Sequence, residues 1–267
     1  IISSNQKTDL DASGADDLDY IGKSRFNFAQ LNSNTIFLNG KLNFILDTYN
    51  WNRKFTNGSE VDNYYSDSYH LKTAFVTNNS IINNVIGYDH VLYKADFENR
   101  GSYNSSVDKN GQQIGVFNNA DLKFNEKLVL SGGYRIDYNN HFGNQKTYRV
   151  GTSYKFKNFN FFNSVSTGFK NPSLYEMYGA DNFGYEGNPD LKPETSHNVE
   201  IGIALNNKKI NAELTTYNTK IKEMIKYANS TYSNDSDGSS TMQGFNLDID
   251  LNLNKFKIKN SYAHVHA

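Results

Sequence analysis

Apolar and polar residues alternate with a period of two along most of this chain. From Phe245 to Leu253 every odd position is apolar and every even position is Asn or Asp. Segments 148–157 and 199–206 show the same alternation. This is the side-chain period of a β-strand, in which successive residues point to opposite faces. The pattern therefore predicts strands that each have one apolar and one polar face.

Turn-forming residues interrupt the alternation at intervals of roughly ten to twelve residues. Short links such as Asn125-Glu126, Lys157-Asn158 and Asn206-Asn207 force antiparallel neighbours. Segment 221–228 also fits helical spacing, but its neighbours are strands and we assign it as one. We predict twelve or thirteen strands, at 20–30, 34–50, 64–77, 80–97, 112–125, 127–139, 145–157, 159–170, 196–206, 208–219, 221–228, 240–254 and 256–267.

Composition excludes several classes of protein. The formal net charge of −1 gives no basic face for nucleic acid, and the absence of Cys excludes disulfides and Cys-based metal or redox sites. No apolar run exceeds three residues, so a transmembrane helix is excluded. No signal peptide is visible, and the first residues read like the middle of a loop, so we interpret the chain as a fragment.

The length of the predicted strands helps to decide which face points inward. A soluble β-sandwich commonly uses ~7–9 strands of about six residues. The strands here run near ten residues, about the length that crosses a bilayer at a tilt. A barrel of this many strands is too wide for side chains to fill, so its inner face can be polar and wet. We therefore predict an all-β, antiparallel transmembrane β-barrel, and the mean hydropathy of −0.69 is compatible with it.

All three prolines, Pro172, Pro189 and Pro193, lie within one window of 22 residues. Proline cannot donate to a sheet ladder, so this window is not a strand interior. We expect a strand to end near Phe169, a structured loop to follow, and the next strand to begin near Thr195. The aromatic side chains of the window form either a girdle or loop core, which we favour, or ligand contacts. They are Phe169, Tyr175, Tyr178, Phe183 and Tyr185.

Around these prolines the chain resembles a known family. The strings GFKNPSLYEMYG (168–179) and GNPDLKPETSHNVEIGI (187–203) closely resemble the barrel signature of TonB-dependent outer-membrane receptors. Segments 115–143, 217–225 and 242–253 resemble the strands on either side of it, and the short loops are most like the cobalamin receptor group. The positions that match the motif loop are Gly168, Phe169, Lys170, Pro172, Leu174, Tyr175, Glu176, Tyr178, Gly179, Asn188, Pro189, Leu191, Pro193 and Glu194.

The resemblance implies a barrel of ~22 strands closed by an N-terminal plug, in the outer membrane of a Gram-negative bacterium. Residues 1–267 would then be a barrel segment that lacks the plug and the C-terminal strands. The implied partners are outer-membrane lipid and lipopolysaccharide, a small nutrient ligand, and the TonB complex acting through the plug; nucleic acid is not among them. We predict energy-dependent uptake of cobalamin or a ferric siderophore. A passive porin or adhesin barrel and a soluble all-β carbohydrate-binding protein or enzyme are the alternatives.

Other candidate sites carry weaker patterns. Asp9 to Asp19, and Asp235 with Asp237 beside Gly238, could hold Ca²⁺, but neither segment has the full calcium-loop pattern, and solvated acids are the alternative interpretation. His264 and His266 share a strand face without an evident third ligand, so we expect lumen or rim histidines. No hydrolase, zinc-protease or nucleotide-binding signature is present. We predict no enzyme activity, no catalytic residue and no cofactor, calcium being the one exception considered.

Overall fold

The computed structural model describes residues 1–9, 20–99, 105–253 and 255–267. Thirteen antiparallel strands form one sheet in which each strand pairs with its neighbours in chain order, as the alternation predicts. The strands are β1 (Ile2–Asp9), β2 (Ile21–Phe37), β3 (Gly40–Asn57), β4 (Glu60–Asn78), β5 (Ile82–Asn99), β6 (Ser106–Lys123), β7 (Leu128–Asn139), β8 (Gly143–Phe156), β9 (Phe159–Lys170), β10 (Glu194–Asn206), β11 (Ile210–Ala228), β12 (Thr231–Leu253) and β13 (Phe256–His266).

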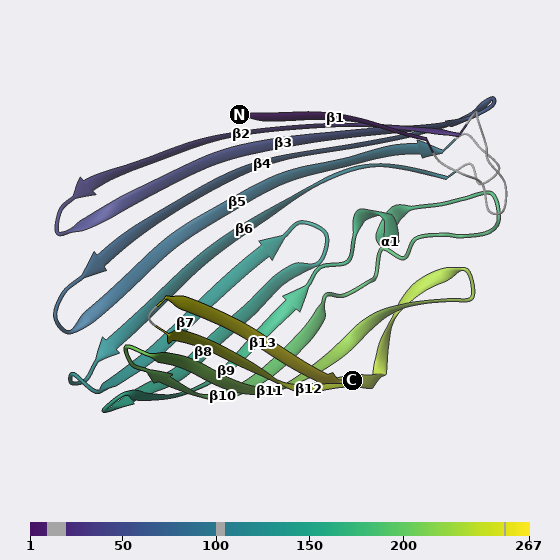
Figure 1. Ribbon diagram of the computed structural model, residues 1–267. Helices are drawn as coiled ribbons and strands as arrows, with labels where there is room; N and C mark the ends of the chain where they lie inside the picture. The colour runs from purple at the N-terminus through teal and green to yellow at the C-terminus, as the bar shows by residue number, and fades with distance from the viewer. Residues whose placement is uncertain (10–19, 100–104, 254) are drawn as a thin grey trace.

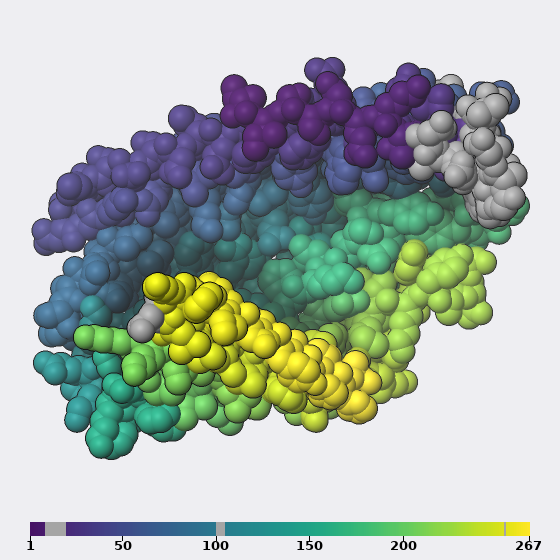
Figure 2. Space-filling view, in the orientation of Figure 1, coloured from purple at the N-terminus to yellow at the C-terminus, as the bar shows by residue number. Residues whose placement is uncertain are grey.

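The sheet curves into an open trough with β1 and β13 at its two edges (Figures 1 and 2). The short helix α1 (Leu174–Tyr178) lies on the concave side, which we call the inner face. Within the described ranges no helix combines the length and the apolar character needed to span a membrane.

The two faces of the sheet differ in the way expected of a membrane barrel. On β7, Leu130, Tyr134 and Ile136 point outward and are 37 %, 46 % and 42 % exposed. Asp137 and Asn139 of the same strand point to the inner face and are only 2 % and 1 % exposed. An apolar outer face against lipid and a polar inner face are the pattern of transmembrane β-barrels. This confirms the predicted fold class, a partial barrel with a polar interior.

Aromatic rings on the inner face lie flat against the wall because glycines stand opposite them. In four cross-strand pairs a Cβ on the glycine would come closer than 3.0 Å to the ring of its partner. The pairs are Gly87–Phe117, Gly111–Tyr93, Gly202–Phe162 and Gly244–Tyr217. The rings therefore cover neighbouring backbone and do not project into the interior.

The two ends of the sheet carry different connections. One end has only short turns, and Asn79, Asn125 and Asn207 close three of them in the same way. In each turn the Asn Oδ1 accepts hydrogen bonds of 2.8–2.9 Å from the backbone N–H groups two and three residues later. The opposite end carries the long connection 171–193. Membrane barrels have short periplasmic turns and long external loops, so 171–193 lies at the extracellular end.

Strand boundaries differ from the prediction at both ends of the chain. β1 was not predicted, and segment 34–50 was predicted as one strand although Leu38 and Asn39 form a turn within it. Leu38 has a φ of 51°, a conformation usually given to Gly or Asn, and the turn signal that the predicted strand ran through is Asn39-Gly40 directly after it. β12 begins at Thr231 and not at 240. Apart from Tyr232, its first residues are polar on both faces, and they extend past the start of β10.

β11 is one continuous strand where two were predicted, at 208–219 and 221–228. A β-bulge shifts the register between Lys222 and Met224, and Glu223 has a φ of 56°. The extra residues of the irregularity lie on β12, where Asp235 and Ser239 are four apart while their partners Met224 and Lys222 are two apart on β11. The assignment of 221–228 as strand is confirmed, and its separation from 208–219 was wrong.

Candidate functional site

The connection 171–193, which we call the brace, forms a packed structure on the inner face (Figure 1). It holds most of the fully buried apolar side chains of the described chain, with Leu174, Met177, Tyr185 and Leu191 between 1 % and 7 % exposed. Helix α1 contacts both β6, which carries the buried Val107, and β12. The prediction of a structured loop between Phe169 and Thr195 is confirmed, and its last residues already belong to β10.

Local hydrogen bonds explain several positions of the motif. Ser173 Oγ accepts from Glu176 N at 3.2 Å and Glu176 Oε2 accepts from Ser173 N at 2.6 Å, a capping box that starts α1 directly after Pro172. Gly179 ends the helix, and its N–H donates to Tyr175 O at 2.8 Å. A Cβ on Gly179 would lie 2.5 Å from the Tyr175 ring, so the chain can turn there only as glycine.

One side of the brace is hydrogen-bonded to the β11–β12 hairpin. Asn188 Nδ2 donates to Tyr232 O at 3.0 Å, and Thr231 Oγ1 donates to Glu186 O at 2.7 Å. Asn234 closes a reciprocal pair with the backbone of Lys192, at 2.8 and 2.9 Å. The motif residue Asn188 therefore ties the brace to β12.

The other side of the brace is attached to β6 and to the β7–β8 turn. Ser106 N donates to Ala180 O at 3.2 Å. The ring of His141 lies between two partners, with Nδ1 2.8 Å from Tyr178 Oη and Nε2 2.8 Å from Asn110 O. The brace thus spans the extracellular mouth of the trough from β6 to β12.

A series of aromatic contacts through the core of the brace connects β5 to β11 and β12. Tyr175 packs on Phe97 of β5 with ring centroids 5.3 Å apart and on Tyr185 at 4.9 Å. Tyr185 packs in turn on Tyr232 and Tyr227, at 5.8 and 6.0 Å, and its hydroxyl donates to Tyr175 O at 2.7 Å. Burial raises the pKa of both Tyr185 and Tyr175, so their phenols are neutral at physiological pH. These contacts support the loop-core interpretation; ligand contact by the same rings stays a prediction.

The remaining motif residues serve the junctions between the brace and its strands. Lys170 Nζ lies 3.3 Å from Glu194 Oε1, and that oxygen also accepts from Ile225 N at 3.0 Å. A Cβ on Gly168 would lie 2.9 Å from Ser196 Oγ on β10. Phe169 pairs with Thr195 in the ladder, Pro193 and Leu191 are buried, and Pro189 is exposed.

Below the brace, charged side chains form a belt across the inner face of β3 to β7. His70 contacts Asp47 at 3.5 Å and also contacts Asp89. Arg135 Nη1 lies 3.0 Å from Asp89 Oδ2, and the guanidinium holds Asp137 with two hydrogen bonds of 2.6 and 2.7 Å. This pairing compensates the negative charge of Asp137, whose side chain is nearly buried.

The belt is joined to the brace through amides. Gln113 Nε2 donates to Asp137 Oδ1 at 3.0 Å, and Asn171 Nδ2 donates to Gln113 Oε1 at 2.8 Å. The alternation of polar and apolar residues in single strands does not reveal this network. Each member is an ordinary polar residue of an alternating strand, and only the register of neighbouring strands brings them to one height. A weak signal existed in Gly115, since a Cβ there would lie 2.6 Å from Arg135 Cζ.

The calcium candidates receive no further ligands from the structure. Asp235 contacts Lys226 and accepts from Gly238 N at 2.9 Å, and the Lys226 ammonium lowers the pKa of Asp235. Among the described residues, no group of three or more acidic, His or Cys side chains is arranged so that it could hold a metal ion. Of the segment Asp9 to Asp19, residues 10–19 lie outside the described residues. Calcium binding at Asp235 and Asp237 stays a prediction.

His264 and His266 of β13 lie on the outer face, where His264 packs on Phe245 with centroids 5.9 Å apart. Of the two places expected for them, lumen or rim, the lumen is wrong, because the register places them on the face that carries the apolar residues of β12.

Comparison with known proteins agrees with this architecture. The family described as "TonB dependent receptor-like, beta-barrel" matches residues 3–267. The vitamin B12 transporter BtuB of Photobacterium profundum is 30 % identical over 146 residues, which cover 50 % of this chain and 23 % of that protein. Transferrin-binding protein A of Haemophilus influenzae is 30 % identical over 162 residues, or 53 % of this chain and 17 % of that protein. The chain thus spans less than a quarter of either relative.

Two solved structures show the same fold. The siderophore receptor PirA of Pseudomonas aeruginosa has a TM-score of 0.76 at 14 % identity, over 92 % of this chain and 50 % of that one. The hemophore receptor HasR of Serratia marcescens, solved with its hemophore and heme, has a TM-score of 0.79 at 11 % identity, over 93 % of this chain and 49 % of that one.

Proposed function

Since this chain belongs to the family of TonB-dependent receptor β-barrels, which are Gram-negative outer-membrane transport proteins and not enzymes, we propose that it serves the energy-dependent uptake of a scarce nutrient. The proposed ligand is cobalamin or a ferric siderophore. The proposed energy source is the TonB complex, acting through a plug domain elsewhere in the full-length protein.

The brace is the observation that carries this proposal. A passive pore conducts best through an open mouth, whereas here a loop with a buried core crosses the extracellular end from β6 to β12. Beneath it, the inner face is polar and charged, which suits a wet path or a hydrophilic plug. The outer face would contact membrane lipid and lipopolysaccharide through its exposed apolar and aromatic side chains.

Uptake by intact cells tests the proposal. A strain that lacks the full-length gene is compared with the complemented strain for accumulation of radiolabelled cobalamin and of ferric siderophores, with and without a protonophore. We expect complementation to restore accumulation of one nutrient and the protonophore to abolish it. Restored permeation of many small solutes that ignores the protonophore would show a passive porin instead.

A further inference from the structure

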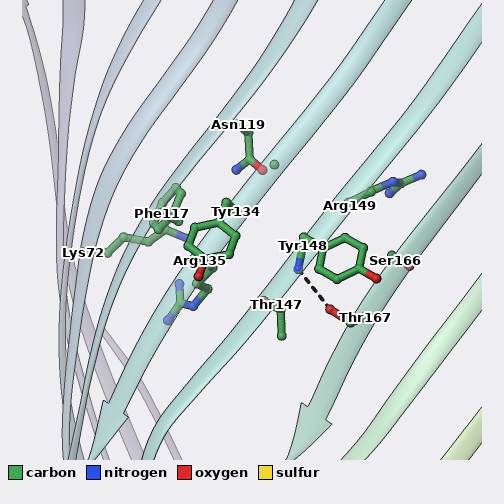
Figure 3. A pocket seen from close by; sticks show the side chains of 11 residues that line it. Lys72, Phe117, Asn119, Tyr134, Arg135, Thr147, Tyr148, Arg149, Ser166 and Thr167 are labelled. Atoms are coloured by element: carbon green, nitrogen blue, oxygen red, sulfur yellow. Dashed lines mark hydrogen bonds between the residues drawn. The ribbon is translucent and has the colours of Figure 1, made fainter.

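The barrel wall forks between β8 and β9 on its extracellular half. The ladder between these strands ends at the pair Arg149–Ser166, although β8 begins at Gly143 and β9 continues to Lys170. At the fork, Tyr148 N donates at 3.0 Å to Thr167 Oγ1, a side-chain oxygen standing in place of a strand carbonyl (Figure 3). Beyond the pair Arg149–Ser166, β8 and β9 are therefore joined through a side chain and no longer by backbone pairing.

A cavity of about 460 Å³ lies at this fork, below the brace. Tyr134, Tyr148 and Thr167 line its outer side, and its lining on the inner face includes three cationic side chains, two hydroxyls and one aromatic ring (Figure 3). These are Lys72, Arg135, Arg149, Thr147, Ser166 and Phe117. Among the described residues that line the cavity there is no Asp or Glu. Its volume falls within the range of small-ligand sites, about 300–1,000 Å³.

The charges around the cavity are not balanced. Arg135 is neutralised by Asp89 and Asp137. In the described chain, neither Lys72 nor Arg149 has a carboxylate oxygen within 4.0 Å. Lys72 Nζ lies 5.7 Å from the Phe117 ring, and Arg149 makes only a long contact of 3.5 Å with Ser164 Oγ. Two cations therefore remain available to a ligand.

We propose that this cavity is a subsite for a carboxylate or phosphate-like oxyanion carried by a small ligand that moves along the inner wall. Arg149 offers a planar fork of donors, Lys72 a point charge, and Thr147 and Ser166 neutral donors. The Phe117 ring, held flat against Gly87, gives the uncharged part of the ligand an apolar surface. The subsite deepens the proposed uptake function and rests on it, because it assigns anionic character to the nutrient.

Citrate serves as the probe, titrated calorimetrically into the full-length receptor in detergent at low ionic strength. We expect saturable binding that Lys72→Gln and Arg149→Gln each weaken by about tenfold, the size of effect of losing one hydrogen bond to a charged group. Lys155→Gln is the matched control, since Lys155 lies on the same strand as Arg149 but outside the cavity. Lys72→Arg, which keeps the charge, should keep the binding.

Heat-modifiable mobility on a gel verifies that each variant is folded. Absence of saturable citrate binding to the wild-type receptor would overturn the proposal, as would equal weakening by Lys155→Gln. Blockage of the site by an acidic segment of the receptor itself would also appear as absent binding and would count against a ligand subsite. Because the titration needs no transport, failed uptake with intact binding would overturn the proposed function alone.

Discussion

Tyr185 provides the sharpest test of how the brace is held. Its ring is 3 % exposed and packs on three other tyrosines, and its hydroxyl makes one hydrogen bond of 2.7 Å. Tyr185→Phe removes only the hydrogen bond, at a cost of about 0.5–1.5 kcal/mol. Tyr185→Ala also removes the ring and leaves a cavity, at a cost of about 3–5 kcal/mol.

The assay is hydrogen exchange of brace amides in the folded receptor, since local opening is measured without unfolding the barrel. Gly187 N, which donates to Gly179 O at 2.6 Å, is a suitable reporter. A loss of about 1 kcal/mol in the free energy of local opening speeds exchange about fivefold. We therefore expect exchange of the Gly187 amide to be about fivefold faster in Tyr185→Phe and more than about a hundredfold faster in Tyr185→Ala. Glu186→Gln, at an exposed neighbour, should leave exchange unchanged. Unaltered protection in Tyr185→Ala would refute the idea that the aromatic core holds the brace.

Three further predictions concern the belt, the acidic hairpin and the phenols. Gly115→Ala should displace the Arg135 guanidinium and so lower the thermal midpoint of unfolding, read from heat-modifiable gel mobility. Arg135→Met should lower it further, because it leaves the buried Asp137 carboxylate unpaired at a cost of about 3–5 kcal/mol in stability. Equal midpoints in both would contradict the pairing. Calcium should raise the midpoint if Asp235 and Asp237 bind it, and a midpoint fixed throughout the titration would remove that prediction. Because burial raises the pKa of Tyr185, its contribution to stability is complete below the ordinary phenol pKa of 10.0 and is lost as pH rises through the higher folded pKa; an absorbance titration should show late-ionising phenols, of which Tyr185→Phe removes one.

The sequence predicted those features that repeat from residue to residue. Alternation predicted β7 and its two faces, and strand length and number predicted its orientation, with Tyr134 on the outer face and Asp137 on the inner face. It failed where one residue departs from the repeat, as Glu223 does at the bulge of β11 and Leu38 does in its turn. Neither Glu223 nor Leu38 is a residue type that favours a positive φ, although Asn39-Gly40 beside Leu38 is a turn signal.

The candidate site was predictable only in part, because its contacts join distant segments. Three prolines marked the brace as a structured loop, but Asn188 and its partner Tyr232 are 44 residues apart. The belt around Arg135 and the cations of the fork likewise depend on the register of strands far apart in the chain. Residue types alone do not show which inward-facing positions of different strands lie at the same level along the barrel axis.

Geometrically, the brace is a chord across an arc. It joins β6 to β12, and the wall between these strands cannot flatten or tighten at the mouth without breaking the contacts at one end of the chord. The curvature of this part of the rim is therefore set by the loop, whatever occupies the interior. If the chain serves uptake as proposed, a nutrient passes beside this fixed span, and we expect the movement that admits it to occur in other parts of the receptor.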